Sequence, residues 1–477
     1  MDAHNFASRK AVAIVGGGLT GGAIAYHLAT RALPADITVF EPRADLGRGL
    51  AYGTDDPAHR INVPAAKMSL LPGDESHFVD WINTNDAIAE DPFALADDGQ
   101  IYVRRSLFGR YVTAHIQPLL NAGKIRHEQT EIVAIARGRN GRWILETRTG
   151  RRHEADIVVL ATTHPPPGVP DLLLEKLDGD RRLIKDATVP DVLEDLPPSA
   201  RIVIVGTGLT MADVVASLDR KQHEGPIYAF SRRGLIARGH ARQAHAPYGE
   251  FTAAPATALG LLRTIRSTID AARRNGIPWQ PVIDAVRAQA STFWPNLPLE
   301  ERKRIVDRLR PYWDVHRFRI APQLEELLAR RIGEGKLTIR AASLAGVTAT
   351  PNTVEITVRL RGSASLETIA ADYVIVTTGP AHGSAIETQP HLAALASAGV
   401  IEADATKLGI SCDRRGHAIT PNGEKMADLL IAGPLARGTF GELMGLPQVT
   451  AYAQTIADEA FEQLSPAKAA RPVVAAR

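Results

Sequence analysis

The chain has 477 residues, of which 45% are hydrophobic and 23% are charged, an ordinary composition for globular domains. Its 55 basic and 53 acidic residues leave a net charge of +2, and only 5% of residues are aromatic, so no nucleic-acid partner is expected. The single cysteine, Cys412, excludes an intrachain disulfide and a Cys-x-x-Cys redox pair, which predicts a cytoplasmic location. No run of about 18 apolar residues occurs, so no membrane span or membrane partner is predicted.

The first predicted unit is a strand, a glycine turn and a helix, beginning with the apolar run KAVAIV at residue 10. Gly16, Gly18 and Gly21 complete a G-x-G-x-x-G pattern. The first glycine permits the tight turn, the second lets the backbone approach a pyrophosphate, and the third lets helix and strand pack closely. Glu41 ends the next predicted strand, where a carboxylate accepts hydrogen bonds from an adenosine ribose. The pattern predicts a dinucleotide site; the alternative is a tight turn without a ligand.

A second unit of the same kind begins with the strand RIVIV at residue 201. Its turn contains Gly206 and Gly208, while a methionine stands where the third glycine would be. Ser231 replaces the acidic residue and is followed by Arg232 and Arg233. A carboxylate would repel a 2′-phosphate, whereas a serine and two guanidinium groups would bind it, so this site is predicted to prefer NADPH to NADH. The alternative is that both arginines belong to a solvated loop.

Three further buried strands are predicted at residues 155–161, 371–377 and 428–432. We expect them to join the first sheet and to end at its carboxyl edge, where ligands bind in open α/β sheets. Gly433, directly after the last of these strands, is therefore assigned to the first dinucleotide site.

The predicted fold is α/β, with two Rossmann-like dinucleotide-binding domains and a helical insertion. The first domain is expected over residues 1–165 and 371–465, and the second over residues 195–370. The insertion is expected at about 251–330, where apolar residues recur three and four apart. Residues 466–477 are rich in Ala, Pro and Lys and are predicted to be disordered.

Residues 47–81 read GRGLAYGTDDPAHRINVPAAKMSLLPGDESHFVDW. Together with the two glycine turns and the closing AGPLARGTF, this segment resembles the FAD-NAD(P)-binding family of bacterial flavoproteins, distant relatives of the class B flavin monooxygenases. The resemblance implies FAD at the first turn and NADPH (or NADH) at the second. Arg48, between Gly47 and Gly49, is included in the FAD site. The Baeyer–Villiger fingerprint of that class is absent, so ring-expanding oxygenation is not expected.

By the same resemblance, Asn62 is a catalytic candidate beside the reactive edge of the flavin ring. The alternative is that Asn62 only stabilises a turn.

The second catalytic candidate is His245, because only histidine titrates near neutrality when unperturbed. His240 and His316 are further candidates, and Arg242 or Arg317 would hold an anionic substrate. The competing interpretation of each is a surface loop residue. No third ligand accompanies the Asp-x-His motif that contains His316, so no metal site is predicted.

With one cysteine, the chain has no disulfide to accept electrons from a reduced flavin, which leaves oxygen or an organic acceptor. The predicted function is an FAD-dependent, NAD(P)H-consuming monooxygenase that hydroxylates a small molecule with oxygen. The specific candidate, implied by resemblance, is urate to 5-hydroxyisourate in purine degradation. One alternative is a dehydrogenase or reductase that passes electrons to an organic acceptor without oxygen insertion. Another is a redox-sensing protein that holds FAD without turnover.

Overall fold

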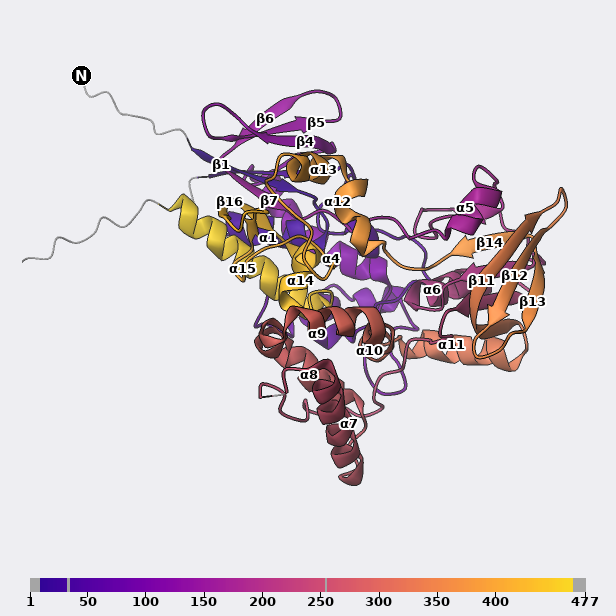
Figure 1. The fold of residues 1–477 in the computed structure, drawn as a ribbon. Helices are drawn as coiled ribbons and strands as arrows, with labels where there is room; N and C mark the ends of the chain where they lie inside the picture. Colours follow the sequence, from indigo (N-terminus) through magenta and orange to yellow (C-terminus); the bar gives the residue numbers. More distant parts are fainter. Residues whose placement is uncertain (1–8, 32–34, 254, 466–477) are drawn as a thin grey trace, which may run out of the picture.

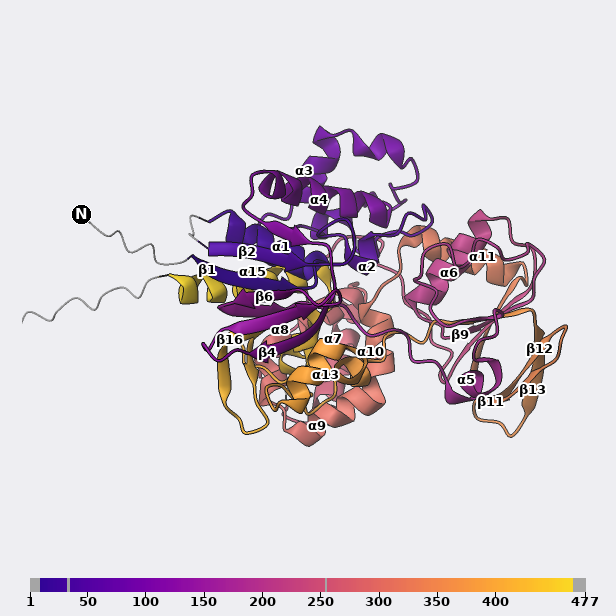
Figure 2. The ribbon, with the colours of Figure 1, turned by 90° about the horizontal axis from the view of Figure 1, so that it is seen from above.

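The computed structural model describes residues 9–31, 35–253 and 255–465 (Figure 1). The predicted disordered tail at 466–477 lies outside these residues. Two sheets with their helices lie side by side in both views, and a group of helices lies below them in Figure 1 (Figures 1 and 2).

The first sheet has six strands in the order β15-β16-β7-β1-β2-β3. Neighbouring strands are parallel except for the antiparallel pair β15–β16. The strands are β1 (Lys10–Val15), β2 (Ala35–Phe40), β3 (Arg126–Glu128), β7 (Ile157–Leu160), β15 (His417–Ile419) and β16 (Lys425–Ile431). A separate antiparallel sheet consists of β4 (Ile132–Arg137), β5 (Trp143–Thr147) and β6 (Arg152–Ala155).

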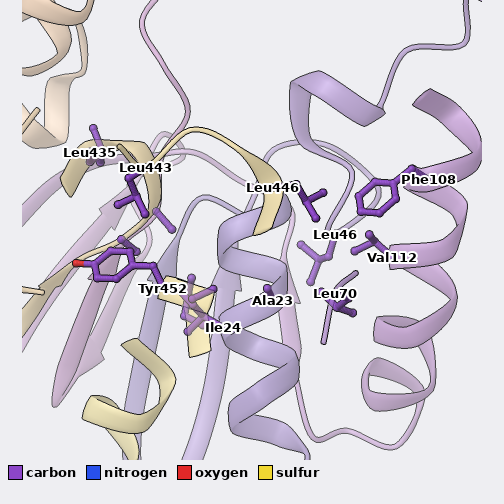
Figure 3. Packing of buried hydrophobic residues seen from close by; sticks show 14 of the residues in the cluster. Ala23, Ile24, Leu46, Leu70, Phe108, Val112, Leu435, Leu443, Leu446 and Tyr452 are labelled. Atoms are coloured by element: carbon purple, nitrogen blue, oxygen red, sulfur yellow. The ribbon is translucent and has the colours of Figure 1, made fainter. Parts of the chain in front are cut away.

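Helix α1 (Leu19–Ala29) is buried over most of its surface, because it packs against both α4 (Arg105–Asn121) and α15 (Leu446–Leu464). Figure 3 shows Ala23 and Ile24 of α1 between Phe108 of α4 on one side and Tyr452 of α15 on the other. The N-terminal and C-terminal segments therefore share one core. The remaining helices around this sheet are α2 (Gly49–Tyr52), α3 (His77–Thr84), α12 (Ala385–Thr388), α13 (Pro390–Ser397) and α14 (Arg437–Phe440).

The second sheet has seven strands in the order β13-β12-β11-β10-β9-β14-β8. The pairs from β8 to β11 are parallel, and β11–β12–β13 form an antiparallel meander. The strands are β8 (Leu183–Ile184), β9 (Ile202–Val205), β10 (Ile227–Ser231), β11 (Leu337–Ala349), β12 (Val354–Leu360), β13 (Leu366–Ala371) and β14 (Tyr373–Val376). Its helices are α5 (Asp171–Leu177), α6 (Leu209–Arg220) and α11 (Pro322–Gly333).

The predicted place of the strand at 371–377 is wrong. We expected it in the first sheet, but β14 pairs with β9 and β8 in the second. A buried strand is compatible with either sheet, and only its pairing decides between them. We therefore propose that the chain returns to the first domain after residue 376 instead of at 371.

Between β10 and β11 the chain forms helices α7 (Ala258–Arg274), α8 (Gln280–Phe293), α9 (Leu299–Arg304) and α10 (Arg310–Arg317), with a π-helical turn (Ile305–Leu309) before α10. We call α7–α10 the helical insertion. It has a hydrophobic core of its own that includes Phe251, Val282 and Trp294. Among the described residues, none of the helices is long and apolar enough to cross a membrane.

Candidate cofactor and substrate site

The first glycine turn is closed by backbone contacts that exclude any side chain. Gly16 has φ +98°, and a Cβ atom there would lie 2.5 Å from the carbonyl oxygen of Ala161 at the end of β7. A Cβ on Gly21 would lie 1.9 Å from the carbonyl oxygen of Gly16. These positions require glycine because β1, α1 and β7 meet there.

Gly18 differs, because a Cβ at that position would meet its nearest atom, Cα of Gly49, only at 3.5 Å. The segment around Gly47 and Gly49 lies directly on the turn: the Gly47 N–H donates to the carbonyl oxygen of Gly17 at 2.8 Å. The backbone of Arg48 is thereby brought to the first turn, while its guanidinium is paired with Asp45 at 3.0 Å and Asp55 at 3.4 Å. The turn thus combines exposed backbone with a nearby cation, as a pyrophosphate requires.

Two residues that are distant in sequence complete this site. Glu41 is 4% exposed, and its Oε2 accepts a hydrogen bond from the Gly17 N–H at 2.9 Å. Gly433 has φ +59°, and a Cβ there would lie 2.6 Å from Oγ1 of Thr20 in the first turn of α1. The structure therefore brings all six residues predicted for FAD to one turn or its immediate neighbours, and these residues fit an adenine dinucleotide.

The second glycine turn has the same construction. Gly206 has φ +124°, and a Cβ there would lie 2.4 Å from the carbonyl oxygen of Thr377, after β14. A Cβ on Gly208 would meet no atom of the described chain within 4 Å, which leaves room for a pyrophosphate. Met211, at the third glycine position, is fully buried in the core and does not block the turn.

The residues that are predicted to bind the 2′-phosphate of NADPH lie at the end of β10. Ser231 lies beside the turn, with its Oγ 2.8 Å from Oγ1 of Thr207. Arg232 is exposed, whereas Arg233 lies over the ring of Tyr312 at 5.5 Å. Hydrogen bonds from Arg361 and then from Arg233 lower the pKa of the Tyr312 phenol.

Arg361 is a residue that the sequence analysis missed. It follows β12, and its N–H donates to the carbonyl oxygen of Ala341, the residue that pairs with Ser231 between β10 and β11. Only the register of three strands brings Arg361 to Ser231, and no local motif marks it.

Asn62 lies at the junction of the first sheet and the segment that follows the helical insertion. Its amide Nδ2 donates to the carbonyl oxygen of Arg319 at 3.3 Å. Its own carbonyl oxygen lies 3.0 Å from Nε2 of His240, whose ring is 5.4 Å from that of Tyr102. Burial lowers the pKa of His240 to about 4, so this histidine is neutral at pH 7.

The structure thus brings His240, and not the predicted candidate His245, against Asn62. His245 lies half-buried further along the same loop, and its catalytic role stays a prediction. His316 lies with its ring 5.0 Å from that of Trp279, and Arg242 is exposed. Arg317 is buried in an ion pair with Glu442. Within the described residues, no group of three or more His, Cys, Asp or Glu side chains could hold a metal ion.

Residues 13–165 match the protein family described as FAD-NAD(P)-binding. The resemblance to this family is confirmed for these residues. They contain the first glycine turn, Glu41, Arg48 and Asn62, and the predicted cofactors agree with the family's description. No curated protein matches the chain.

Solved structures resemble the chain over nearly its whole length. The ornithine N-hydroxylase of Kutzneria sp. 744, with reduced FAD, NADP+ and L-ornithine, is 16% identical with a TM-score of 0.66, and the match covers 96% of this chain and 99% of that one. The L-lysine 6-monooxygenase of Pseudomonas syringae is 16% identical with a TM-score of 0.61, covering 96% and 100%. The bacillithiol disulfide reductase of Staphylococcus aureus is 13% identical with a TM-score of 0.55, covering 96% and 99%. The predicted α/β fold with two Rossmann-like units is confirmed.

Proposed function

We propose that this protein is an FAD-dependent, NAD(P)H-consuming monooxygenase that hydroxylates a small molecule. The observation that carries the proposal is the pairing of two dinucleotide turns with a half-buried polar contact between Asn62 and His240. Two cofactor sites indicate that NAD(P)H would reduce the flavin by hydride transfer and that the reduced flavin would pass two electrons on to an acceptor. The chain shares its fold with an ornithine N-hydroxylase and with an L-lysine 6-monooxygenase.

Bound FAD, once reduced by NAD(P)H, would supply the activated oxygen; the chain's own residues set position and solvent access. The first turn would hold the dinucleotide through backbone N–H groups, and the amide of Asn62, which donates to the carbonyl oxygen of Arg319, would help to position the substrate. His240 is neutral at pH 7, so its ring offers one hydrogen-bond donor and one acceptor, and Nε2 already lies 3.0 Å from the carbonyl oxygen of Asn62. The helical insertion covers this region and would exclude water from the reaction.

The substrate is proposed at two levels. Urate, converted to 5-hydroxyisourate, is the specific candidate that the family resemblance implies. Small amines are the second candidate, supported by the ornithine and lysine enzymes that share the fold. Urate and small amines should therefore both be tested as substrates.

The second candidate function is a flavin reductase that does not insert oxygen. The observation that favours it is the shared fold of the bacillithiol disulfide reductase. In this chain the acceptor would be an organic molecule other than an internal disulfide, because Cys412 is the single cysteine and is buried.

The deciding experiment follows NADPH oxidation and oxygen uptake in the flavin-loaded protein, with urate, L-ornithine, L-lysine or no addition. We expect one compound to stimulate both rates equally, with loss of that compound and little peroxide. NADPH oxidation that continues without oxygen when a quinone is supplied, and that no compound couples to oxygen uptake, would establish the reductase instead.

A further inference from the structure

A group of four arginines is buried where the helical insertion meets the first sheet. The four are Arg287 on α8, Arg317 at the end of α10, Arg319 just after it, and Arg437 on α14. Their side chains are 17%, 0%, 7% and 3% exposed, respectively. Removing a guanidinium group from water is costly unless an anion is paired with it, so each of these residues requires a partner.

Two of the four have a carboxylate in direct contact. Arg319 forms a bidentate pair with Asp284 at 2.8 and 3.1 Å. Arg317 forms a close ion pair with the fully buried Glu442. Each pair neutralises its own arginine. The Arg317–Glu442 pair connects the insertion to the segment after β16, whereas the Arg319–Asp284 pair joins α8 to the residues that follow α10.

The other two arginines, Arg437 and Arg287, have no carboxylate at hydrogen-bond distance within the described residues. The nearest carboxylate oxygen that Arg437 contacts belongs to Asp314 at 3.7 Å, and its Nη1 donates to the weak acceptor Sδ of Met444 at 3.4 Å. Arg287 is 3.8 Å from both Asp284 and Glu442, which are already engaged, and it donates to Oε1 of Gln448 at 3.3 Å. The Nε atoms of both have no hydrogen-bond partner within the described parts of the chain.

The charge of this group is therefore unbalanced. Four arginines contact three carboxylates, those of Asp284, Asp314 and Glu442, and Arg310 adds a further cation at 3.3 Å from Asp314. Burial lowers the pKa of Arg437 to about 10, and burial followed by Arg317 does the same for Arg287. Both guanidinium groups are still charged at pH 7, so an anion is the missing partner.

The position of the group connects it to the cofactor site. Arg437 lies four residues after Gly433, which contacts the first turn of α1. His164 follows β7 at the same edge of the sheet, and its pKa is lowered to about 4 by burial and then by Arg437. The group thus lies at the carboxyl edge of the first sheet, where ligands bind in this class of fold.

Building on the proposed monooxygenase, we infer that its substrate carries a carboxylate, which amino acids have and urate lacks, and that Arg437 and Arg287, which share Arg317 and Glu442 as neighbours, bind that group. A carboxylate supplies the charge that Asp314 and Glu442 leave unmatched, and it can accept from a guanidinium at two oxygens. Arg287 comes from the helical insertion and Arg437 from the first domain, so the bound acid also joins the insertion to the domain that holds FAD.

The test measures binding without turnover. Oxidised, FAD-loaded protein is titrated with succinate, glutarate and benzoate, and with cadaverine as a cation of similar size, by isothermal titration calorimetry. We expect saturable binding of at least one acid and none of cadaverine. Arg437→Gln should weaken that binding at least tenfold, Arg437→Lys less so, and Arg287→Gln severalfold. Arg273→Gln, on the exposed face of α7, should leave it unchanged.

Acid binding that is equal in all variants would overturn the inference, as would a preference for cadaverine. Loss of FAD from Arg437→Lys, seen in the flavin absorbance, would instead assign the arginine to the cofactor. If Arg437→Gln does not fold, the inferred carboxylate site is still tested by Arg437→Lys and Arg287→Gln. It is also tested by the preference of the unaltered protein for acids over cadaverine. The calorimetry contains no NADPH and measures acid binding without turnover. A failure of acid binding is therefore distinguishable from a failure of the monooxygenase assay.

Discussion

Two glycines of the first turn, three residues apart, have different physical reasons for being glycine. Gly21 has no space for a Cβ atom because the backbone of Gly16 lies in contact with it. A Cβ atom on Gly18 would fit against the surrounding protein. The absence of a side chain there instead leaves open the side from which a pyrophosphate would approach.

We therefore expect Gly18→Val to lose FAD while retaining the fold, and Gly21→Ala to lower the stability of the fold itself. The flavin absorbance of purified protein and its melting temperature separate the two effects. A yellow, fully loaded Gly18→Val protein would show that the first turn does not hold the cofactor.

The 2′-phosphate preference is a second property of single residues. Arg233 and Arg361 both donate to Tyr312 and lie near Ser231. Charge-assisted hydrogen bonds contribute about 1.5–3 kcal/mol each. Arg233→Ala and Arg361→Ala should each raise the KM for NADPH about tenfold and leave the KM for NADH nearly unchanged. Steady-state kinetics with both nucleotides tests this, with Arg340→Ala as a control; equal changes for both would contradict a 2′-phosphate site.

At the scale of elements, the helical insertion is attached to the first domain by a few specific contacts. The Arg317–Glu442 pair is buried, and the indole N–H of Trp294 donates to the carbonyl oxygen of Gly438 at 2.9 Å. A Cβ on Gly441 would lie 2.5 Å from the indole ring of Trp294, which explains the glycine there. These contacts fix the position of α8 and α10 over the sheet edge.

Glu442→Gln removes the charge of one partner and leaves Arg317 buried without a counter-ion. Breaking a buried pair in this way costs about 3–5 kcal/mol, so the free energy of unfolding should fall by that order. Urea denaturation measures it. Glu300→Gln, which changes an exposed carboxylate of the same insertion, serves as the control and should change stability by less than about 0.5 kcal/mol.

At the scale of the whole molecule, several histidines are buried in their neutral form. Burial lowers the pKa of His164, His240 and His391 from the usual 6.5 of a histidine to about 4. His391 is 5% exposed, and its burial outweighs the opposing effects of Glu131 and of a backbone hydrogen bond with Ile132. Protonating such a group in the folded state is costly, whereas in the unfolded chain it costs nothing extra.

Between pH 6.5 and 4 the unfolded chain therefore binds more protons than the folded one, and stability falls as the pH falls. Each such histidine contributes a slope of up to about 1.4 kcal/mol per pH unit. Replacing His391 by Leu should flatten the dependence by about one such slope. Urea denaturation at pH 7, 6 and 5, at constant ionic strength, measures this; an unchanged slope would mean that His391 is protonated when folded.

The sequence by itself determined the two glycine turns, the strands that lead into them and the α/β fold. These features are local: a positive φ, a close backbone approach and the apolar spacing of a strand are all encoded within about 30 residues. The same local information indicated the acid at Glu41 and the serine and arginines after β10.

Only the tertiary structure decided which sheet contains β14, which histidine contacts Asn62, and that Arg361 joins Arg233 at Tyr312. It also brought Arg287 and Arg437, 150 positions apart in the chain, into one buried group. The physical reason is the same in each case. Strand pairing and the docking of an insertion depend on contacts between distant segments, and the local pattern of residues is compatible with several such arrangements.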